Sequence, residues 1–240
     1  MDQYIDIKMR DGNVAAYIAR PKHLPAPAVV VLHEVFGVNA DMRATCDKLA
    51  ASGFIAICPE LYWRQQAGLD LNRFSKSDWK VGLALNAAYD RDQGVEDIAT
   101  TVAAARVLSD ATGLVGVMGF CIGGLMTFLM AARGQIDAAV AYHGGETEKY
   151  LGEAEAITAP MLMHLAGRDE YIDPQAQIAI KQVLATKTNV TICTYPDNYH
   201  AFARHSGSTM IHGPLTLPTS GRARSWPCTC AWLHTRRSQR

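Results

Sequence analysis

The segment that most restricts the possible folds is a strand that runs straight into a cysteine between glycines. The apolar run Leu114–Met118 is followed at once by Gly119-Phe120-Cys121-Ile122-Gly123-Gly124, and residues 124–132 have helical character. A turn from strand to helix in so few residues strains the middle residue, and glycines two positions to either side relieve the clash. The segment therefore predicts a sharp turn that presents Cys121, at a helix N-terminus that favours a thiolate. The alternative is a buried core cysteine beside a glycine turn.

Strand and helix patterns alternate along the rest of the chain. Asp11-Gly12 between two apolar runs predicts a hairpin, and residues 60–92 are expected to be irregular. Further strands are predicted at 28–33, 54–58, 138–142, 161–165 and 190–195, and further helices at 39–52, 95–108 and 174–185. This alternation predicts an α/β fold with a mostly parallel central sheet and helices on both faces.

Length and composition fit one globular domain with a substantial core. The chain has 240 residues, of which 49% are hydrophobic. It has no run of about 18 apolar residues, so no membrane span is expected. The first residues are acidic and lack the apolar core of a secretory signal, so a cytoplasmic location is expected. Cys228 and Cys230 are separated by a single residue, which does not match the ligand spacing of zinc sites, and no metal is expected.

An acid and a base follow Cys121 in the order used by α/β-hydrolases. Asp169 lies just past the predicted strand 161–165, and His200 lies just past the strand 190–195. The carboxyl ends of parallel strands are where active sites form in open α/β sheets. We expect His200 to be the general base and Asp169 to orient it. Asp173 and Asp197 are rival acids, although each could instead cap a helix or form a turn.

Other polar residues also follow predicted strands. Glu34 comes after the strand 28–33, where it is either a site carboxylate or a solvated loop acid. His143 ends the strand 138–142 beside two glycines and could approach the site, whereas His164 lies inside an apolar strand and is expected to be structural.

Residues 4–205 resemble the dienelactone hydrolase family, also called carboxymethylenebutenolidases. The motifs that carry the resemblance are His33-Glu34-Val35-Phe36-Gly37, Pro59-Glu60-Leu61-Tyr62, Gly119-Phe120-Cys121-Ile122-Gly123-Gly124, Gly167-x-Asp169 and His200-Ala201-Phe202-Ala203-Arg204. The resemblance implies an α/β-hydrolase fold and hydrolysis of an ester or lactone through a cysteine acyl-thioester. It implies a dienelactone-like substrate that carries a carboxylate, and no metal or other cofactor.

The resemblance also implies roles for residues near the predicted triad of Cys121, Asp169 and His200. Glu34 corresponds to a carboxylate that contacts the resting thiol and helps to activate it when substrate binds. The backbone N–H groups of Ile122 and Val35 would form the oxyanion hole.

The resemblance implies two arginines that bind the substrate, and the sequence offers a clear match for only one of them. Arg204 resembles one of two arginines that hold the carboxylate of the substrate, a task that suits its planar fork of donors. The second should lie in the region 70–85, where Arg73, Lys76 and Lys80 are all available and none is a clear match.

Residues 206–240 differ in composition from the rest of the chain. All 23 acidic residues precede position 198, whereas six arginines follow it. Glycine and proline recur, so the long terminal helix of the family is not expected here. We therefore place the hydrolase domain at 1–205 and an atypical basic C-terminal tail at 206–240. A change of reading frame near 206–212 or a natural, mostly disordered extension would explain the tail.

Together these features predict an ester or lactone hydrolase that acts on a small molecule. The alternative is a non-catalytic or redox-sensing protein of the same fold, with Cys121 as a reactive thiol. A sensor, however, needs no orienting acid such as Asp169. The basic tail raises nucleic-acid binding as a third possibility, but neither a nucleic-acid nor a membrane partner is expected. The chain is expected to be a monomer or a weak homo-oligomer.

Overall fold

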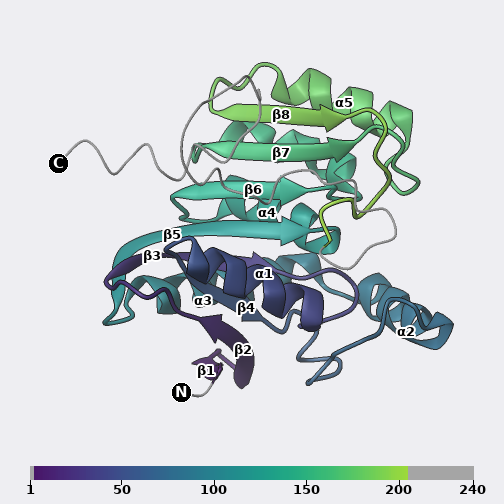
Figure 1. Ribbon diagram of the computed structural model, residues 1–240. Helices are drawn as coiled ribbons and strands as arrows, with labels where there is room; N and C mark the ends of the chain where they lie inside the picture. The colour runs from purple at the N-terminus through teal and green to yellow at the C-terminus, as the bar shows by residue number, and fades with distance from the viewer. Residues whose placement is uncertain (1–2, 205–240) are drawn as a thin grey trace.

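The computed structural model describes residues 3–204, which form one eight-stranded sheet with helices on both faces (Figure 1). The strand order is β1-β2-β4-β3-β5-β6-β7-β8. The strands are β1 (Tyr4–Lys8), β2 (Asn13–Ala19), β3 (Ala26–Leu32), β4 (Ile55–Pro59), β5 (Ala111–Phe120), β6 (Ala138–Tyr142), β7 (Met161–Ala166) and β8 (Val190–Tyr195). The predicted boundary at 205 and the predicted tail at 206–240 lie outside the described residues.

Only the N-terminal edge of the sheet is antiparallel. β1 and β2 form a hairpin, in which the Met9 N–H donates to the Gly12 carbonyl across the Asp-Gly turn. β2 then pairs antiparallel with β4, and every pairing from β4 to β8 is parallel. The predicted α/β fold with a mostly parallel sheet is confirmed.

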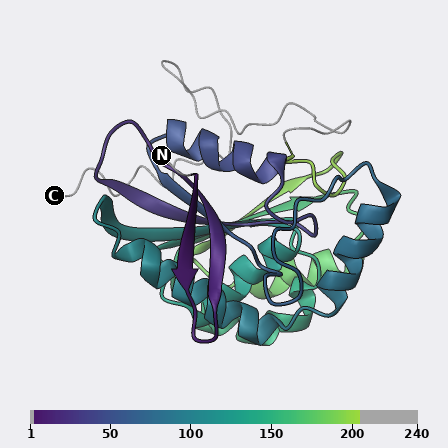
Figure 2. The same ribbon diagram turned by 90° about the horizontal axis from the view of Figure 1, so that it is seen from below.

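The helices cover the two faces unequally. α1 (Ala40–Ala51) lies on one face, while α3 (Arg91–Arg106), α4 (Ile122–Arg133) and α5 (Pro174–Leu184) lie on the other (Figure 2). α4 is apolar on all sides and nearly all of its residues are buried, as expected of a helix in the middle of a core. The helix α2 (Lys76–Ala87) stands apart at the margin of the molecule (Figure 1).

The core has two layers, one on each face of the sheet. Along β3, Val30 and Leu32 belong to the layer under α3 and α4, while Val29 and Val31 belong to the layer under α1. Both layers are buried, which is why this strand is a continuous apolar run rather than an alternating one. Full burial of each such side chain stabilises the fold by about 1.5–3 kcal/mol.

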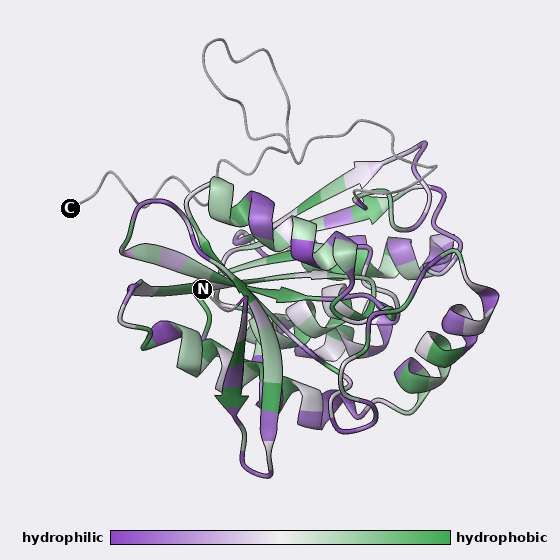
Figure 3. Ribbon diagram, turned by 60° about the horizontal axis from the view of Figure 1, so that its bottom comes forward, coloured by the Kyte–Doolittle hydropathy of each residue, from purple (hydrophilic) through white to green (hydrophobic). Residues whose placement is uncertain are grey.

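The expectation that residues 60–92 are irregular is wrong in part, because α2 lies within them. Ser75 caps the helix by accepting from the Asp78 N–H, but Gly82 is the only fully buried residue of α2. Hydrophobic and hydrophilic residues both occur along this helix (Figure 3). Without an apolar stripe, the sequence has no helical period to detect. A short 3₁₀ segment, Thr147–Ala156, was likewise not predicted.

Within residues 3–204, no helix is long and apolar enough to cross a membrane.

Candidate active site

Cys121 occupies the strained turn between β5 and α4. Its backbone has φ 55° and ψ −117°, and it is the N-cap residue of α4. A Cβ at Gly119 would lie 2.0 Å from the Gly123 carbonyl oxygen, and one at Gly123 would lie 2.2 Å from the Leu32 carbonyl oxygen. Both contacts are with backbone that cannot move aside, so the two glycines are required for a turn this tight.

Asp169 and His200 form a buried pair beside this turn. Nδ1 of His200 lies 2.9 Å and 3.0 Å from the two carboxylate oxygens of Asp169, to which it donates. Asp169 follows β7 and also accepts from the N–H groups of Tyr171 and Ile172, at 2.9 Å and 3.1 Å. The backbone N–H of His200 donates to the Glu170 carboxylate at 3.1 Å. These contacts fix both the acid and the ring.

The two rival acids make other contacts. Asp173 is the N-cap of α5 and accepts from the Ala176 N–H at 2.8 Å. Asp197 pairs with Arg168 at 2.9 Å on the surface. Asp169 is therefore the acid that pairs with His200.

The electrostatics of His200 favour its protonated form. Burial alone would lower the pKa of the ring, but hydrogen bonds to Asp169 and Cys121 and the negative charges of these two groups outweigh it and raise the pKa to about 10. Nε2 of His200 makes no hydrogen bond of ordinary geometry within residues 3–204, and Cys121 is the group on that side whose interaction raises the pKa of the ring.

Glu34 is buried rather than solvated, so its reading as a solvated loop acid is wrong. The residue is 3% exposed, and one carboxylate oxygen accepts from Arg204 Nε at 2.6 Å. The other oxygen has no partner within the described part of the chain. Burial alone would lower the pKa of Arg204, but the Glu34 charge raises it, so the pair is an ion pair at neutral pH.

Arg73 lies close enough to Arg204 for the charge of one guanidinium to affect the pKa of the other. Burial and then the Arg204 guanidinium lower the pKa of Arg73, while Asp41, at 4.0 Å, and Glu34 partly offset this. Nε of Arg73 is buried with no hydrogen-bond partner in the described chain. Lys76 and Lys80 are both exposed. Of the three basic residues that the sequence left open, the structure brings Arg73 to the site.

Val35 and Ile122 lie past the ends of adjacent strands. Leu32 of β3 pairs with Gly119 of β5, so each of the two residues follows this register pair by three positions. Both residues are buried, at 3% and 4% exposed. Ile122 is the first residue of α4, where helical N–H groups have no acceptor within the helix.

The structure answers the question that the sequence left open for His143 and agrees with the structural role expected of His164. His143 does approach the site, because its ring centroid lies 4.5 Å from that of His200. His164 is structural, with Nδ1 at 2.9 Å from the Tyr195 hydroxyl and its ring stacked on Tyr142.

His33 has a role that the sequence did not predict. It donates from Nδ1 to the Glu34 carbonyl and accepts at Nε2 from the Leu61 N–H at 2.9 Å. Burial lowers the pKa of His33 to about 4, so the ring is neutral and can make both bonds. Through these two hydrogen bonds, His33 connects the loop that carries Glu34 to the loop after β4.

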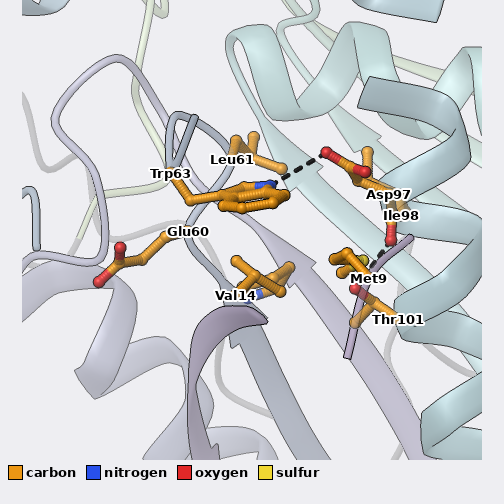
Figure 4. Close-up of a pocket in the computed structure, with 9 residues that line it drawn as sticks. Met9, Val14, Glu60, Leu61, Trp63, Asp97, Ile98 and Thr101 are labelled. Atoms are coloured by element: carbon orange, nitrogen blue, oxygen red, sulfur yellow. Dashed lines mark hydrogen bonds between the residues drawn. The ribbon is translucent and has the colours of Figure 1, made fainter. Parts of the chain in front are cut away.

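A small cavity lies away from these residues, near the antiparallel edge of the sheet (Figure 4). Met9, Val14, Trp63 and Ile98 are among its lining, and the Trp63 indole N–H donates to Asp97 at 3.1 Å. Its volume of about 10 Å³ is no larger than one water requires. Within the described range, no group of side chains could hold a metal ion.

Comparison with known proteins agrees with this geometry. The sequence profile of the dienelactone hydrolase family matches residues 14–236. Carboxymethylenebutenolidase 1 of Cupriavidus pinatubonensis is 34% identical over 214 residues, which are 89% of this chain and 91% of that protein. The carboxymethylenebutenolidase of Pseudomonas putida is 33% identical over 219 residues, which are 91% and 93% of the two chains.

Solved structures give the same result. A crystal structure from Klebsiella pneumoniae that carries the name dienelactone hydrolase is 30% identical, with a TM-score of 0.73, and the match covers 83% of this chain and 86% of that one. The dienelactone hydrolase-like phosphotriesterase P91 from metagenomic libraries shares the fold at 22% identity and a TM-score of 0.68, over 83% and 82% of the chains. The chain therefore belongs to the dienelactone hydrolase family and is an ester or lactone hydrolase with the α/β-hydrolase fold.

Proposed function

We propose that the chain hydrolyses a carboxylate-bearing ester or lactone through an acyl-thioester on Cys121. The observation that carries this proposal is the buried Asp169–His200 pair, which interacts with Cys121 on the strained turn. A nucleophile beside a base that a third group orients is the arrangement that covalent catalysis requires.

Acylation begins with transfer of the thiol proton of Cys121 to Nε2 of His200. The thiolate attacks the substrate carbonyl carbon, and the carbonyl electrons move to the oxygen. The N–H groups of Ile122 and Val35 bind this oxyanion. As the tetrahedral intermediate collapses, the carbon–oxygen bond of the ester breaks and His200 returns the proton to the leaving oxygen. The elevated pKa of His200 favours the first of these transfers.

Deacylation repeats the sequence with water. His200 takes a proton from the water, and the resulting hydroxide attacks the thioester carbon. The carbon–sulfur bond breaks and the proton returns to the sulfur, which restores the Cys121 thiol and releases the carboxylic acid. No other group has to supply or accept electrons.

Glu34 couples substrate binding to activation of the thiol. In the resting site Arg204 holds one oxygen of Glu34. A substrate carboxylate that binds Arg204 would compete with Glu34 for the guanidinium and leave that acid free to turn toward Cys121. The freed Glu34 carboxylate would then stand beside the Cys121 thiol and help it give up its proton to Nε2 of His200.

Arg73 and Arg204 support a substrate that is itself an anion. Two adjacent guanidiniums repel one another, and a carboxylate between them would relieve that repulsion. Nε of Arg73, which makes no hydrogen bond within the described chain, supplies a donor for it. The named activity of the C. pinatubonensis and P. putida relatives, carboxymethylenebutenolidase, concerns a lactone with a carboxymethylene substituent. A dienelactone-like substrate therefore fits the proposed site.

Steady-state hydrolysis by two variants tests this function. Cys121→Ala should lose at least about 10³-fold in kcat on both a dienelactone and an activated neutral ester, since the nucleophile is gone. Cys121→Ser should also be much weaker than the parent, because a hydroxyl is far harder to deprotonate than a thiol. Hydrolysis that survives in Cys121→Ala would exclude the proposed mechanism.

A further inference from the structure

His143 touches both the backbone of Cys121 and the ring of His200. Its Nδ1 accepts from the Cys121 N–H at 3.2 Å. Its ring centroid lies 4.5 Å from that of His200, with the two planes inclined by 59°. The side chain is fully buried, at 0% exposed. One ring therefore joins the turn that carries the thiol to the loop that carries the base.

The backbone at position 143 is held as firmly as the ring. The His143 N–H donates to the His164 carbonyl of β7 at 2.8 Å. Its φ is 38°, in the left-handed region, which residues other than glycine adopt uncommonly and asparagine, aspartate and histidine adopt more often than the rest. A residue fixed in this way at the end of β6 gives the ring a defined position between β5 and the loop after β8.

The ring is neutral and its proton is on Nε2. Burial lowers the pKa of His143 well below its usual range, and the nearby His200 and Arg204 charges lower it further. Since Nδ1 accepts a hydrogen bond, the single proton must occupy Nε2. A neutral ring adds no positive charge beside His200.

Simple packing does not account for a histidine here. Within residues 3–204, Nε2 of His143 is buried with no hydrogen-bond partner, a situation that native proteins usually avoid. A phenylalanine would fill nearly the same volume without an unpaired donor. The property that a phenylalanine lacks is the acceptor at Nδ1, which is the atom that binds the nucleophile's own N–H.

We infer that His143 is a positioning residue for the reaction, which holds the backbone of Cys121 and the ring of His200 at the separation that thiol-to-imidazole proton transfer requires. This inference rests on the proposed function of Cys121. The Cys121 N–H is shared with the Tyr142 carbonyl at 3.1 Å, so loss of the acceptor should misplace the thiol rather than unfold the turn. Loss of one such bond corresponds to about a fivefold change in rate.

Two variants separate the acceptor from the ring. His143→Phe keeps the size of the ring and removes the acceptor. His143→Asn keeps an acceptor, Oδ1, close to the Cα and suits the left-handed backbone. If His143→Phe fails to fold, His143→Leu repeats the same comparison with a smaller apolar side chain.

The readout is the rate at which iodoacetamide alkylates Cys121, measured between about pH 5 and about pH 10 by mass spectrometry of the peptide that contains it. This rate reports the thiolate and needs no turnover. None of the variants substitutes the other titratable or charged residues around the two histidines, which are Cys121, His164, Asp169, Glu170, Tyr171 and Arg204. Melting temperature, kcat and KM are measured on the same samples.

We expect His143→Phe to alkylate about fivefold more slowly than the parent, with a similar fall in kcat and with KM within about twofold. His143→Asn should recover most of both rates. Parent-like alkylation and kcat in His143→Phe would overturn the inference, as would a His143→Asn variant no better than His143→Phe. Cys121→Ala, assayed alongside, keeps the two claims apart: hydrolysis that survives there contradicts the proposed function, whereas an unaffected His143→Phe contradicts only the inference about His143.

Discussion

Asp169 concentrates several hydrogen bonds on one buried carboxylate. It accepts from two backbone N–H groups and faces Nδ1 of His200 with both oxygens. An amide in its place would present a donor to a ring nitrogen that must itself donate, and the ring would turn or change tautomer. The negative charge that stabilises the imidazolium would also be lost.

Asp169→Asn is therefore expected to lower kcat by about 10²–10⁴-fold with a small effect on KM, as measured by steady-state hydrolysis of a neutral ester. Asp197→Asn is the matched control, because Asp197 is exposed and pairs only with Arg168 in the described chain. If both variants lost the same activity, Asp169 would have no special role in orienting His200.

The two arginines differ in what their removal would leave behind. Arg204→Ala would strip the partner from a buried carboxylate, Glu34, and so disturb the fold as well as the substrate site. Arg73 makes no comparably short ion pair, since its contact with Asp41 is 4.0 Å. Substitution of Arg73 is therefore the cleaner test of substrate charge.

We expect Arg73→Ala to raise KM for a carboxylate-bearing lactone about tenfold and to leave KM for a neutral ester within about twofold. Lys76→Ala, which removes an exposed charge three positions away, should change neither value. Equal effects of Arg73→Ala on the acidic and neutral substrates would contradict the proposed anionic substrate.

α2 contacts the loop that carries Val35 through Gly82 and Trp79. A Cβ at Gly82 would lie 2.4 Å from the carbonyl oxygen of Val35, whose N–H is a proposed oxyanion donor. Trp79 of the same helix packs edge-on against Phe36, with the ring centroids 4.7 Å apart. The position of α2 and the position of the Val35 loop are therefore linked.

Gly82→Ala should push α2 away from this loop, at a cost of about 1–3 kcal/mol in the free energy of unfolding, and should lower kcat on all esters alike. Leu83→Ala, at an exposed neighbouring position, should do neither. Urea denaturation and steady-state kinetics check both effects. A fully active and equally stable Gly82→Ala variant would show that the helix does not set the loop.

The elements differ in how well the sequence predicts them. Buried strands such as β3 and β6 are continuous apolar runs, and the turn at Cys121 is set by clashes that only glycine relieves, so local pattern suffices for both. In α2, Trp79 and Leu85 pack against the core, but the apolar side chains of Val81 and Leu83 are exposed. The sequence therefore shows no clear helical period.

The residues of the site likewise differ in how well the sequence predicts them. Asp169 and His200 follow predicted strands, so strand order alone brings them near Cys121. The Glu34–Arg204 ion pair joins residues 170 positions apart, and the choice of Arg73 over Lys76 and Lys80 depends on where one loop folds back. No spacing in the chain encodes such contacts, because tertiary packing decides them.

For the whole molecule, the His200 pair links stability to pH. Burial lowers the folded-state pKa of His200, but hydrogen bonds to Asp169 and Cys121 and the negative charges of both groups outweigh burial and raise the pKa from 6.5 to about 10. A pKa raised by folding means that the folded chain binds the proton more tightly than the unfolded chain. The stabilisation is therefore complete below pH 6.5 and is lost as the pH rises toward about 10.

We expect the difference in free energy of unfolding between the parent and His200→Gln to shrink steadily between pH 6.5 and about pH 10. Urea denaturation at a series of pH values measures it, and Asp197→Asn serves as a control whose difference from the parent should stay constant over that range. A parent–variant difference for His200→Gln that does not change with pH would contradict the raised pKa.

The central claim is that Cys121 becomes acylated during turnover, and mass spectrometry after rapid quenching tests it most directly. The parent is mixed with an activated ester, quenched with acid within milliseconds and digested, and the peptide containing Cys121 is compared with that from Cys121→Ala. We predict that the parent peptide gains the mass of the acyl group, that the gain disappears as the substrate is exhausted, and that no peptide of the variant gains it at a comparable rate. Full turnover with no transient adduct on Cys121, or with an adduct on another residue, would contradict the account.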